Sequence, residues 1–239
     1  SNSSLITPTL TIISAVKGVL PENNLLLNHW LLKKGIKSSQ FVAIMGPCHA
    51  EEVAAEKLSY LTFAGEEKSL RNQIAAAFKT SYINTVLSND VDGIQYAAVL
   101  KNVYALGTGI ANGLGYGDNF QSVLIANAAG EMKRFLQSLA TMDGINYAAS
   151  VYLGDLLVTC YSLFSRNRSF GNMIGKGYSV DAAKLSMQMV AEGYPASRAM
   201  FQINEKVGVK MPIAAAVYDI LWNGKDPAHA FEDLEQWLY

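Results

Sequence analysis

The sequence changes character near residue 90, and this change constrains the possible fold more than any other feature of the chain. Before residue 90, short apolar runs rich in β-branched residues alternate with helix-like segments and end at turns. The apolar runs lie at residues 11–16, 41–45, 60–64 and 82–86, and the helix-like segments lie at 21–34, 50–57 and 66–78. This alternation predicts an α/β layer whose sheet is largely buried.

After residue 90 the strand signal nearly disappears. Helical segments are expected at residues 92–106, 119–142, 154–163, 180–191, 196–207, 212–222 and 227–238, with turns at 113–117, 175–177, 193–195 and 223–224 between them. Several of these helices are apolar almost all round, which predicts burial on more than one side. We therefore expect two domains, an α/β domain over residues 1–90 and an all-α domain over residues 91–239.

Composition and charge exclude several classes of protein. Half of the residues are hydrophobic and 16% are charged, a balance that excludes a disordered chain. The net charge of −1 argues against a nucleic-acid partner. No apolar run approaches the roughly 18 residues of a membrane span, and no signal peptide is visible, so we expect no membrane insertion and a cytoplasmic location. Two distant cysteines and three scattered histidines predict no metal site.

A dinucleotide-binding α/β domain normally opens with a strand and a GxGxxG turn. No such turn precedes Lys17. The α/β part is therefore predicted to be the second half of such a domain, and a chain beginning at Ser1 is expected to be inactive by itself.

Lys101 is the first candidate for chemistry. Its helical neighbours three and four positions away are Ala97, Ala98, Tyr104 and Ala105. Such a lysine either extends its ammonium to solvent along an apolar surface or is desolvated, with a lowered pKa, and acts as a general base. The residues alone leave both interpretations open.

Arginines and a carboxylate supply further candidates. Arg166 and Arg168 flank Asn167 after an apolar helix, where they could bind phosphate or simply cover a solvated turn at the helix end. Asp155 follows Gly154 and opens an apolar helix, either as an N-cap or as a carboxylate that orients a lysine or a substrate hydroxyl.

Two strand ends carry the remaining candidates. The residues at 17–18 and 46–50 follow apolar strands, at the sheet edge where ligands bind in open α/β folds. An ordinary turn is the alternative at each position.

Taken in order, the segments "SAVKG", "GPCHAEEVA", "VLKNVYALGTGIANGLGYGDN", "LGDLLVTC", "SRNRSFG", "VAEG" and "VKMPIAAAVYDILWNGKDP" resemble the NAD(P)-dependent glycerol-3-phosphate dehydrogenase family of bacterial type. The resemblance implies a partial Rossmann domain followed by an all-α domain like the C-terminal domain of 6-phosphogluconate dehydrogenase. It implies the reversible reduction of dihydroxyacetone phosphate to sn-glycerol 3-phosphate for phospholipid synthesis, with NAD or NADP as cofactor. A homodimer is expected.

The resemblance also implies roles for individual residues. Lys101 matches the catalytic lysine, which takes the C2 hydroxyl proton in oxidation and returns it in reduction. The matching substrate-binding positions are Lys17, Gly46, Asn102, Asp155, Thr159, Ser165, Arg166 and Asn167, and the matching cofactor-binding positions are Lys17, Ala50, Arg166 and Glu192. Cys48 stands where the family often has serine or threonine.

Two other functions remain open. One is another dehydrogenase of the same superfamily that acts on a 3-hydroxyacid, which would not need Arg166 for a phosphate. The other is a non-catalytic helical module for binding or assembly, which would have no need for a lysine inside an apolar helix.

Overall fold

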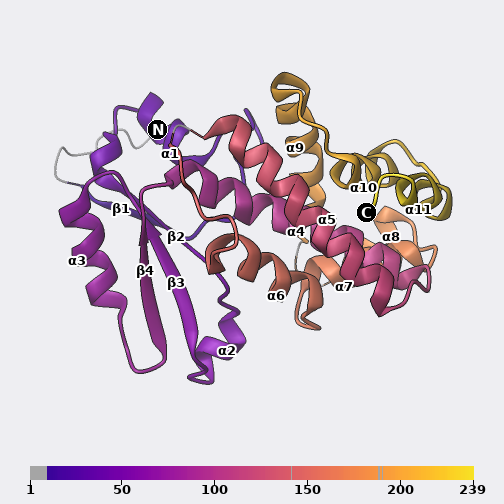
Figure 1. Cartoon of the computed structure of the whole chain (residues 1–239), viewed down its shortest axis with the longest axis horizontal. Coiled ribbons are helices and arrows are strands. Elements are labelled where there is room, and N and C mark those ends of the chain that lie inside the picture. Colours follow the sequence, from indigo (N-terminus) through magenta and orange to yellow (C-terminus); the bar gives the residue numbers. More distant parts are fainter. Residues whose placement is uncertain (1–9, 141, 188, 190) are drawn as a thin grey trace.

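A computed structural model describes residues 10–140, 142–187, 189 and 191–239 of the chain. Figure 1 shows a sheet with its helices on one side of the molecule and a larger group of helices on the other. The predicted fold class, an α/β part followed by an all-helical part, is thus confirmed, and the domain boundary near residue 90 stays a prediction. Residues 1–9, which include the Ser1 start of the chain, lie outside the described residues, as does Val190 of the "VAEG" segment.

All four predicted strands are present, and they form one sheet in the order β1-β2-β3-β4. The strands are β1 (Ile12–Ser14), β2 (Phe41–Met45), β3 (Ser59–Ala64) and β4 (Ile83–Ser88). β1 pairs with β2 and β3 with β4 in parallel, whereas β2 and β3 are antiparallel, so the sheet is mixed. Each parallel pair is joined by a crossover that contains a helix, α1 (Leu27–Lys33) or α3 (Lys68–Phe78), as parallel pairing requires.

Two helices of this part are shorter than the sequence predicts, and a residue in the left-handed region accounts for each difference. Helix α1 begins at Leu27 rather than near residue 21, because Asn24 has a φ of 55°. Helix α2 (Ala50–Ala54) ends early, just before Glu56, whose φ is 54°. A left-handed residue cannot continue a right-handed helix. A 3₁₀ turn at Ser38–Gln40 leads into β2.

The helical part is built around one long helix, α4 (Val91–Gly113), in which almost every residue from Ile94 to Ala111 is buried. The helices around it are α5 (Asp118–Leu139), α6 (Asp155–Tyr161), α7 (Arg166–Gly175), α8 (Val180–Ser186), α9 (Gly193–Val207), α10 (Pro212–Trp222) and α11 (Pro227–Glu235), and a π-helical turn over Ser150–Gly154 precedes α6. The prediction of helices buried on several sides is confirmed. No helix among the described residues is long and apolar enough to cross a membrane.

Helices α4 and α7 touch backbone to backbone through glycines. A Cβ atom added to Gly109 of α4 would lie 2.1 Å from the Arg168 carbonyl oxygen. One added to Gly171 of α7 would lie 2.1 Å from the Leu106 carbonyl oxygen. Only glycine permits this approach, which holds α7 along the C-terminal half of α4.

Three expectations about the helical part were wrong. The segment from Ser165 to Arg168 begins helix α7 instead of ending a helix, and the Ser165 hydroxyl caps it by accepting the Arg168 N–H at 3.3 Å. The expected turn at residues 193–195 is the first turn of α9, where a proline is tolerated. Helix α8 ends at Ser186 rather than near residue 191.

Candidate active site

The Lys101 side chain is buried and paired. Its Nζ lies 2.5 Å from Asp155 Oδ1, and the two side chains are 6% and 1% exposed. Asp155 stands at the first position of α6 but caps no backbone N–H with its side chain. Its other carboxylate oxygen, Oδ2, is buried without a hydrogen-bond partner among the described residues. The geometry therefore favours the orienting carboxylate over the N-cap for Asp155, and the desolvated amine over the solvent-exposed ammonium for Lys101.

Burial lowers the pKa of Lys101 to about 8, because desolvation penalises the ammonium. The Asp155 carboxylate opposes this effect by favouring the charged form, while the nearby Lys17 ammonium adds to it. An amine with a pKa near 8 can both accept and return a proton near neutral pH, as a general acid–base group must.

Most of the predicted site residues line one cavity beyond the carboxyl ends of β1 and β2. Its walls are formed by Lys17, Cys48, His49, Ala50, Glu51, Lys101, Asn102, Thr159, Phe164, Ser165, Arg166, Asn167 and Glu192. Lys17 follows β1, and Ala50 follows β2 at the start of α2. Segments far apart in the sequence thus bring nine of the eleven predicted residues to one place. Asp155 adjoins the cavity through its contact with Lys101.

A chain of side-chain amides joins the elements around this cavity. Asn167 Oδ1 accepts the Gly193 N–H at 2.8 Å, and Asn167 Nδ2 donates to Asn102 Oδ1 at 3.0 Å. Asn102 Nδ2 in turn lies 3.5 Å from the Lys17 carbonyl oxygen and 3.4 Å from Glu192 Oε2. These contacts connect α4, α7, α9 and the start of the segment that follows β1.

Three of the predicted substrate residues are engaged in local structure. Ser165 caps α7, and the Thr159 hydroxyl donates to the Asp155 carbonyl oxygen at 2.6 Å. Gly46 does not line the cavity; a Cβ atom there would lie 2.7 Å from the Tyr60 carbonyl oxygen, at a φ of 129°. The position therefore requires glycine because β2 and β3 approach closely, and its contribution to binding stays a prediction.

Arg166 is exposed, and its guanidinium is available to a ligand. Among the described residues, its Nη1 donates to the Met189 sulfur at 3.3 Å, a weak acceptor. A planar, permanently charged donor at the mouth of a cavity suits a phosphate group.

Sequence reasoning missed two wall residues. Phe164, 63% exposed, directly precedes the capping Ser165, and Glu51 lies in the first turn of α2. An exposed aromatic residue beside the arginine segment was the available signal for Phe164. Among the described residues, no group of three or more His, Cys, Asp or Glu side chains could hold a metal ion.

The lining of the cavity offers groups that could hold part of a nicotinamide dinucleotide. The four predicted cofactor positions, Lys17, Ala50, Arg166 and Glu192, all border it, and they offer two cationic groups, a backbone segment and a carboxylate. A cleft beyond the ends of strands is where open α/β folds bind their ligands.

Comparison with known proteins identifies the family. The model of the NAD-dependent glycerol-3-phosphate dehydrogenase C-terminus matches residues 90–232, and the model of the N-terminus of the same family matches residues 1–71. This chain belongs to the NAD-dependent glycerol-3-phosphate dehydrogenase family. The family, the fold class and the NAD(P) dependence implied by the resemblance are thereby confirmed.

Individual relatives agree. A glycerol-3-phosphate dehydrogenase [NAD(P)+] of Chlorobium limicola is 36% identical over 225 residues, which are 93% of this chain and 67% of the relative. One of Bacillus cytotoxicus is 34% identical over 96% of this chain and 68% of the relative. The crystal structure of glycerol-3-phosphate dehydrogenase from Coxiella burnetii superposes with a TM-score of 0.91 at 26% identity, over 97% of this chain and 70% of that one.

Proposed function

We propose that Lys101 is the acid–base group for the interconversion of dihydroxyacetone phosphate and sn-glycerol 3-phosphate, with NAD or NADP as partner. The observation that carries this proposal is the buried Lys101–Asp155 pair at the base of a cavity whose mouth holds Arg166. A phosphorylated three-carbon substrate needs both a cation for its phosphate and a proton carrier at C2.

In the oxidation direction, the neutral Lys101 amine takes the proton of the C2 hydroxyl as the C2 carbonyl forms. A nicotinamide bound in the cavity would supply the acceptor for the hydride that leaves C2. Asp155 stabilises the resulting ammonium, and its unpartnered Oδ2 lies in the same buried environment. In reduction, the ammonium returns the proton to the developing alkoxide, so protons balance in both directions.

Arg166 and Lys17 hold the substrate phosphate in this scheme. Both line the cavity, and the Arg166 fork matches a phosphate oxygen pair. The requirement for a cation at this point favours the phosphorylated substrate over a 3-hydroxyacid. Lys17, Ala50, Arg166 and Glu192 would hold the cofactor.

Replacing the base while keeping its charge tests the proposal. Lys101→Arg should lower kcat by about 10²- to 10⁴-fold, because a guanidinium does not deprotonate near neutral pH. Lys176→Arg, at an exposed position after α7, is the matched control and should be unaffected. Turnover of the Lys101→Arg enzyme near that of the wild type would mean that lysine supplies only charge.

We also infer a homodimer in the cytoplasm that supplies sn-glycerol 3-phosphate to phospholipid synthesis. The free cysteines Cys48 and Cys160 suit a reducing compartment. Large exposed apolar side chains such as Leu163 and Leu185, 83% and 88% exposed, support association. Light scattering and cell fractionation test these two points; a monomer or a secreted protein would contradict them.

A further inference from the structure

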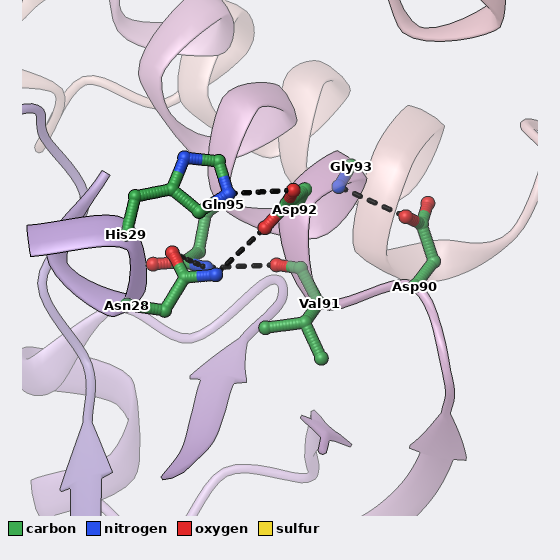
Figure 2. A network of polar contacts seen from close by, with 7 residues as sticks. All are labelled: Asn28, His29, Asp90, Val91, Asp92, Gly93 and Gln95. Atoms are coloured by element: carbon green, nitrogen blue, oxygen red, sulfur yellow. Dashed lines mark hydrogen bonds and ion pairs between the residues drawn. The ribbon is translucent and has the colours of Figure 1, made fainter. Parts of the chain in front are cut away.

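A polar network at the start of α4 ties this helix to α1. Figure 2 shows Asp92 accepting from Asn28 Nδ2 at 2.7 Å and meeting His29 Nε2 at 2.8 Å. Gln95 Nε2 donates to Asn28 Oδ1 at 3.1 Å and to the Val91 carbonyl oxygen at 2.8 Å. Both carboxylate oxygens of Asp92 are therefore occupied by α1, and we refer to the set Asn28, His29, Asp92 and Gln95 as the α1–α4 clamp.

The clamp holds one end of the segment that carries Lys17. This segment leaves β1, passes Lys17 and enters α1 at Leu27. Its other end touches α4 where the Lys17 carbonyl oxygen meets Asn102 Nδ2 at 3.5 Å. Asp92 and Asn102 are ten residues apart on the helix, so the two attachment points lie about 15 Å apart along its axis.

A third contact fixes the middle of the same segment. Asn24 Nδ2 donates to Gln202 Oε1 of α9 at 2.7 Å. The segment between β1 and α1 is thus attached to the helical part near its start, its middle and its end. Of these attachments, the clamp has the most hydrogen bonds and includes an ion pair when His29 is protonated.

We infer that the α1–α4 clamp is a positioning device that holds the segment carrying Lys17 against α4, and so keeps Lys17 at the wall of the cavity that it shares with Lys101. The inference rests on the proposed role of Lys101 as the base. Lys17 acts on Lys101 as a like charge, which disfavours a second ammonium in the same small space. If the segment moves away, this repulsion weakens and Lys101 binds its proton more tightly.

The clamp itself responds to protonation. Its hydrogen bond to Asp92 raises the pKa of His29, while burial and the Lys33 ammonium on the same helix lower it. The other charged groups around the adjoining cavity are Lys37, Glu66 and Asp90, and α5 contributes only apolar side chains there. The contact should therefore be strongest when His29 is protonated and weaken as the pH rises through its raised pKa.

The test measures the titration of Lys101 directly. Lysine labelled with ¹³C at Cε gives one NMR signal per lysine, and Lys101→Met assigns the signal of interest. In the double variant Asn28→Ala/His29→Ala, the pKa of Lys101 should rise so that its neutral fraction at pH 7 falls about three-fold. His29→Gln, which keeps an N–H donor for Asp92, should restore most of the neutral fraction when combined with an intact Asn28.

Lys17→Ala, alone and combined with the double variant, completes a double-mutant cycle between the clamp and Lys17. It should lower the neutral fraction of Lys101 in the wild type and change it little in the double variant, because the clamp acts through Lys17. A folded double variant with an unchanged Lys101 titration would overturn the inference, as would additive effects of the two changes. If the double variant does not fold, His29→Ala alone is judged by the same two criteria. The titration does not depend on turnover, so failure of the proposed catalytic role would appear separately, in the Lys101→Arg assay.

Discussion

Two buried carboxylates lie near α4, one turn apart, and they are satisfied in opposite ways. Asp155 pairs with Lys101, which lines the cavity, and its Oδ2 has no hydrogen-bond partner in the part of the chain that the structure describes. Glu131 of α5, completely buried near Tyr104, accepts the N–H groups of Ile213 and Ala214 at 2.9 Å each. The first centre, the Lys101–Asp155 pair, thus has a carboxylate oxygen free to accept a hydrogen bond. In the second centre, Glu131, both carboxylate oxygens accept hydrogen bonds from the start of α10.

The difference indicates that the Lys101–Asp155 pair serves reactivity and that Glu131 serves stability. Glu131 satisfies two backbone donors that would otherwise be orphaned at a helix N-terminus. Among the described residues it forms no ion pair, although the Arg134 guanidinium lies near enough to lower its pKa. Lys101 instead is held desolvated, which costs folding free energy near neutral pH but lowers its pKa into a useful range. Changes at the first centre should therefore affect turnover, and changes at the second should affect unfolding.

We expect the largest effect from a substitution that disrupts the close packing of α4 against α7. Gly109→Ala would place a methyl group 2.1 Å from the Arg168 carbonyl oxygen, and backbone of α7 cannot yield as a flexible side chain would. We expect a loss of at least about 3 kcal/mol in the free energy of unfolding, at the upper end for overpacked cores. Chemical denaturation measures it.

Gly117→Ala is the matched control, because nothing lies within 4 Å of its added Cβ atom and its φ is negative. Gly117 is the N-cap of α5, where alanine is less favourable than glycine, so the loss in the free energy of unfolding should stay at or below about 1 kcal/mol. Equal effects of the two substitutions would contradict the close approach of α4 and α7.

The next effect is a pH dependence of stability from Glu131. Burial raises its pKa to about 7, partly offset by the Ala214 and Ile213 N–H groups. Between the ordinary value of 4.5 and about 7, the folded state binds this proton more tightly than the unfolded state, so stability falls as the pH rises. The full change is about 3 kcal/mol.

Glu131→Gln removes this titration. Denaturation curves between pH 4.5 and 8 should therefore diverge between the variant and the wild type, while the kinetic constants of the variant stay close to normal. His29 titrates in both proteins and cancels in the difference. Parallel curves would show that Glu131 does not change its protonation in this range.

A smaller effect is confined to the first centre. Arg166→Ala should raise KM for dihydroxyacetone phosphate by about 10- to 100-fold, which corresponds to the 1.5–3 kcal/mol of a charge-assisted hydrogen bond. Since Arg166 is exposed, the free energy of unfolding should hardly change. Dihydroxyacetone, which lacks the phosphate, should be affected far less; an equal loss with both substrates would place the phosphate elsewhere.

Much of the fold could be predicted from the sequence, because its signals are local. The strands are apolar runs that end at turns, and the predicted bounds of α10 hold because Pro212 starts it and Asn223–Gly224 ends it. Helix α7 could not be predicted in the same way. Two glycines lower its helix propensity, and it forms because those glycines let it pack on α4.

The site residues likewise fall into those that the sequence predicts and those that only the tertiary structure brings together. Lys101 and Arg166 were identifiable from residue type and from the resemblance to the family. The pairing of Asn102 with Asn167, 65 residues apart, and the contact of His29 with Asp92, 63 residues apart, depend on tertiary structure alone. The antiparallel register of β2 and β3 is of the same kind, since it is set by how the connection through α2 returns.

The smallest expected effect tests the cost of the catalytic pair most directly. Replacing Lys101 and Asp155 together by Met and Leu removes a buried ion pair whose two charges had to be desolvated. Such replacements are commonly neutral or stabilising, and we expect a gain of about 1–2 kcal/mol near neutral pH with complete loss of turnover. Either single change should instead destabilise, because it leaves one charge buried without its partner.

Between pH 8 and 10.5 the unfolded wild-type chain binds more protons at Lys101 than the folded chain, so wild-type stability rises with pH and the gain of the double variant should shrink. Unfolding free energies of the wild type, both single variants and the double variant at pH 7 and pH 9.5 measure these differences. A double variant less stable than both single variants would show that the pair stabilises the fold, and would remove the distinction between this centre and Glu131.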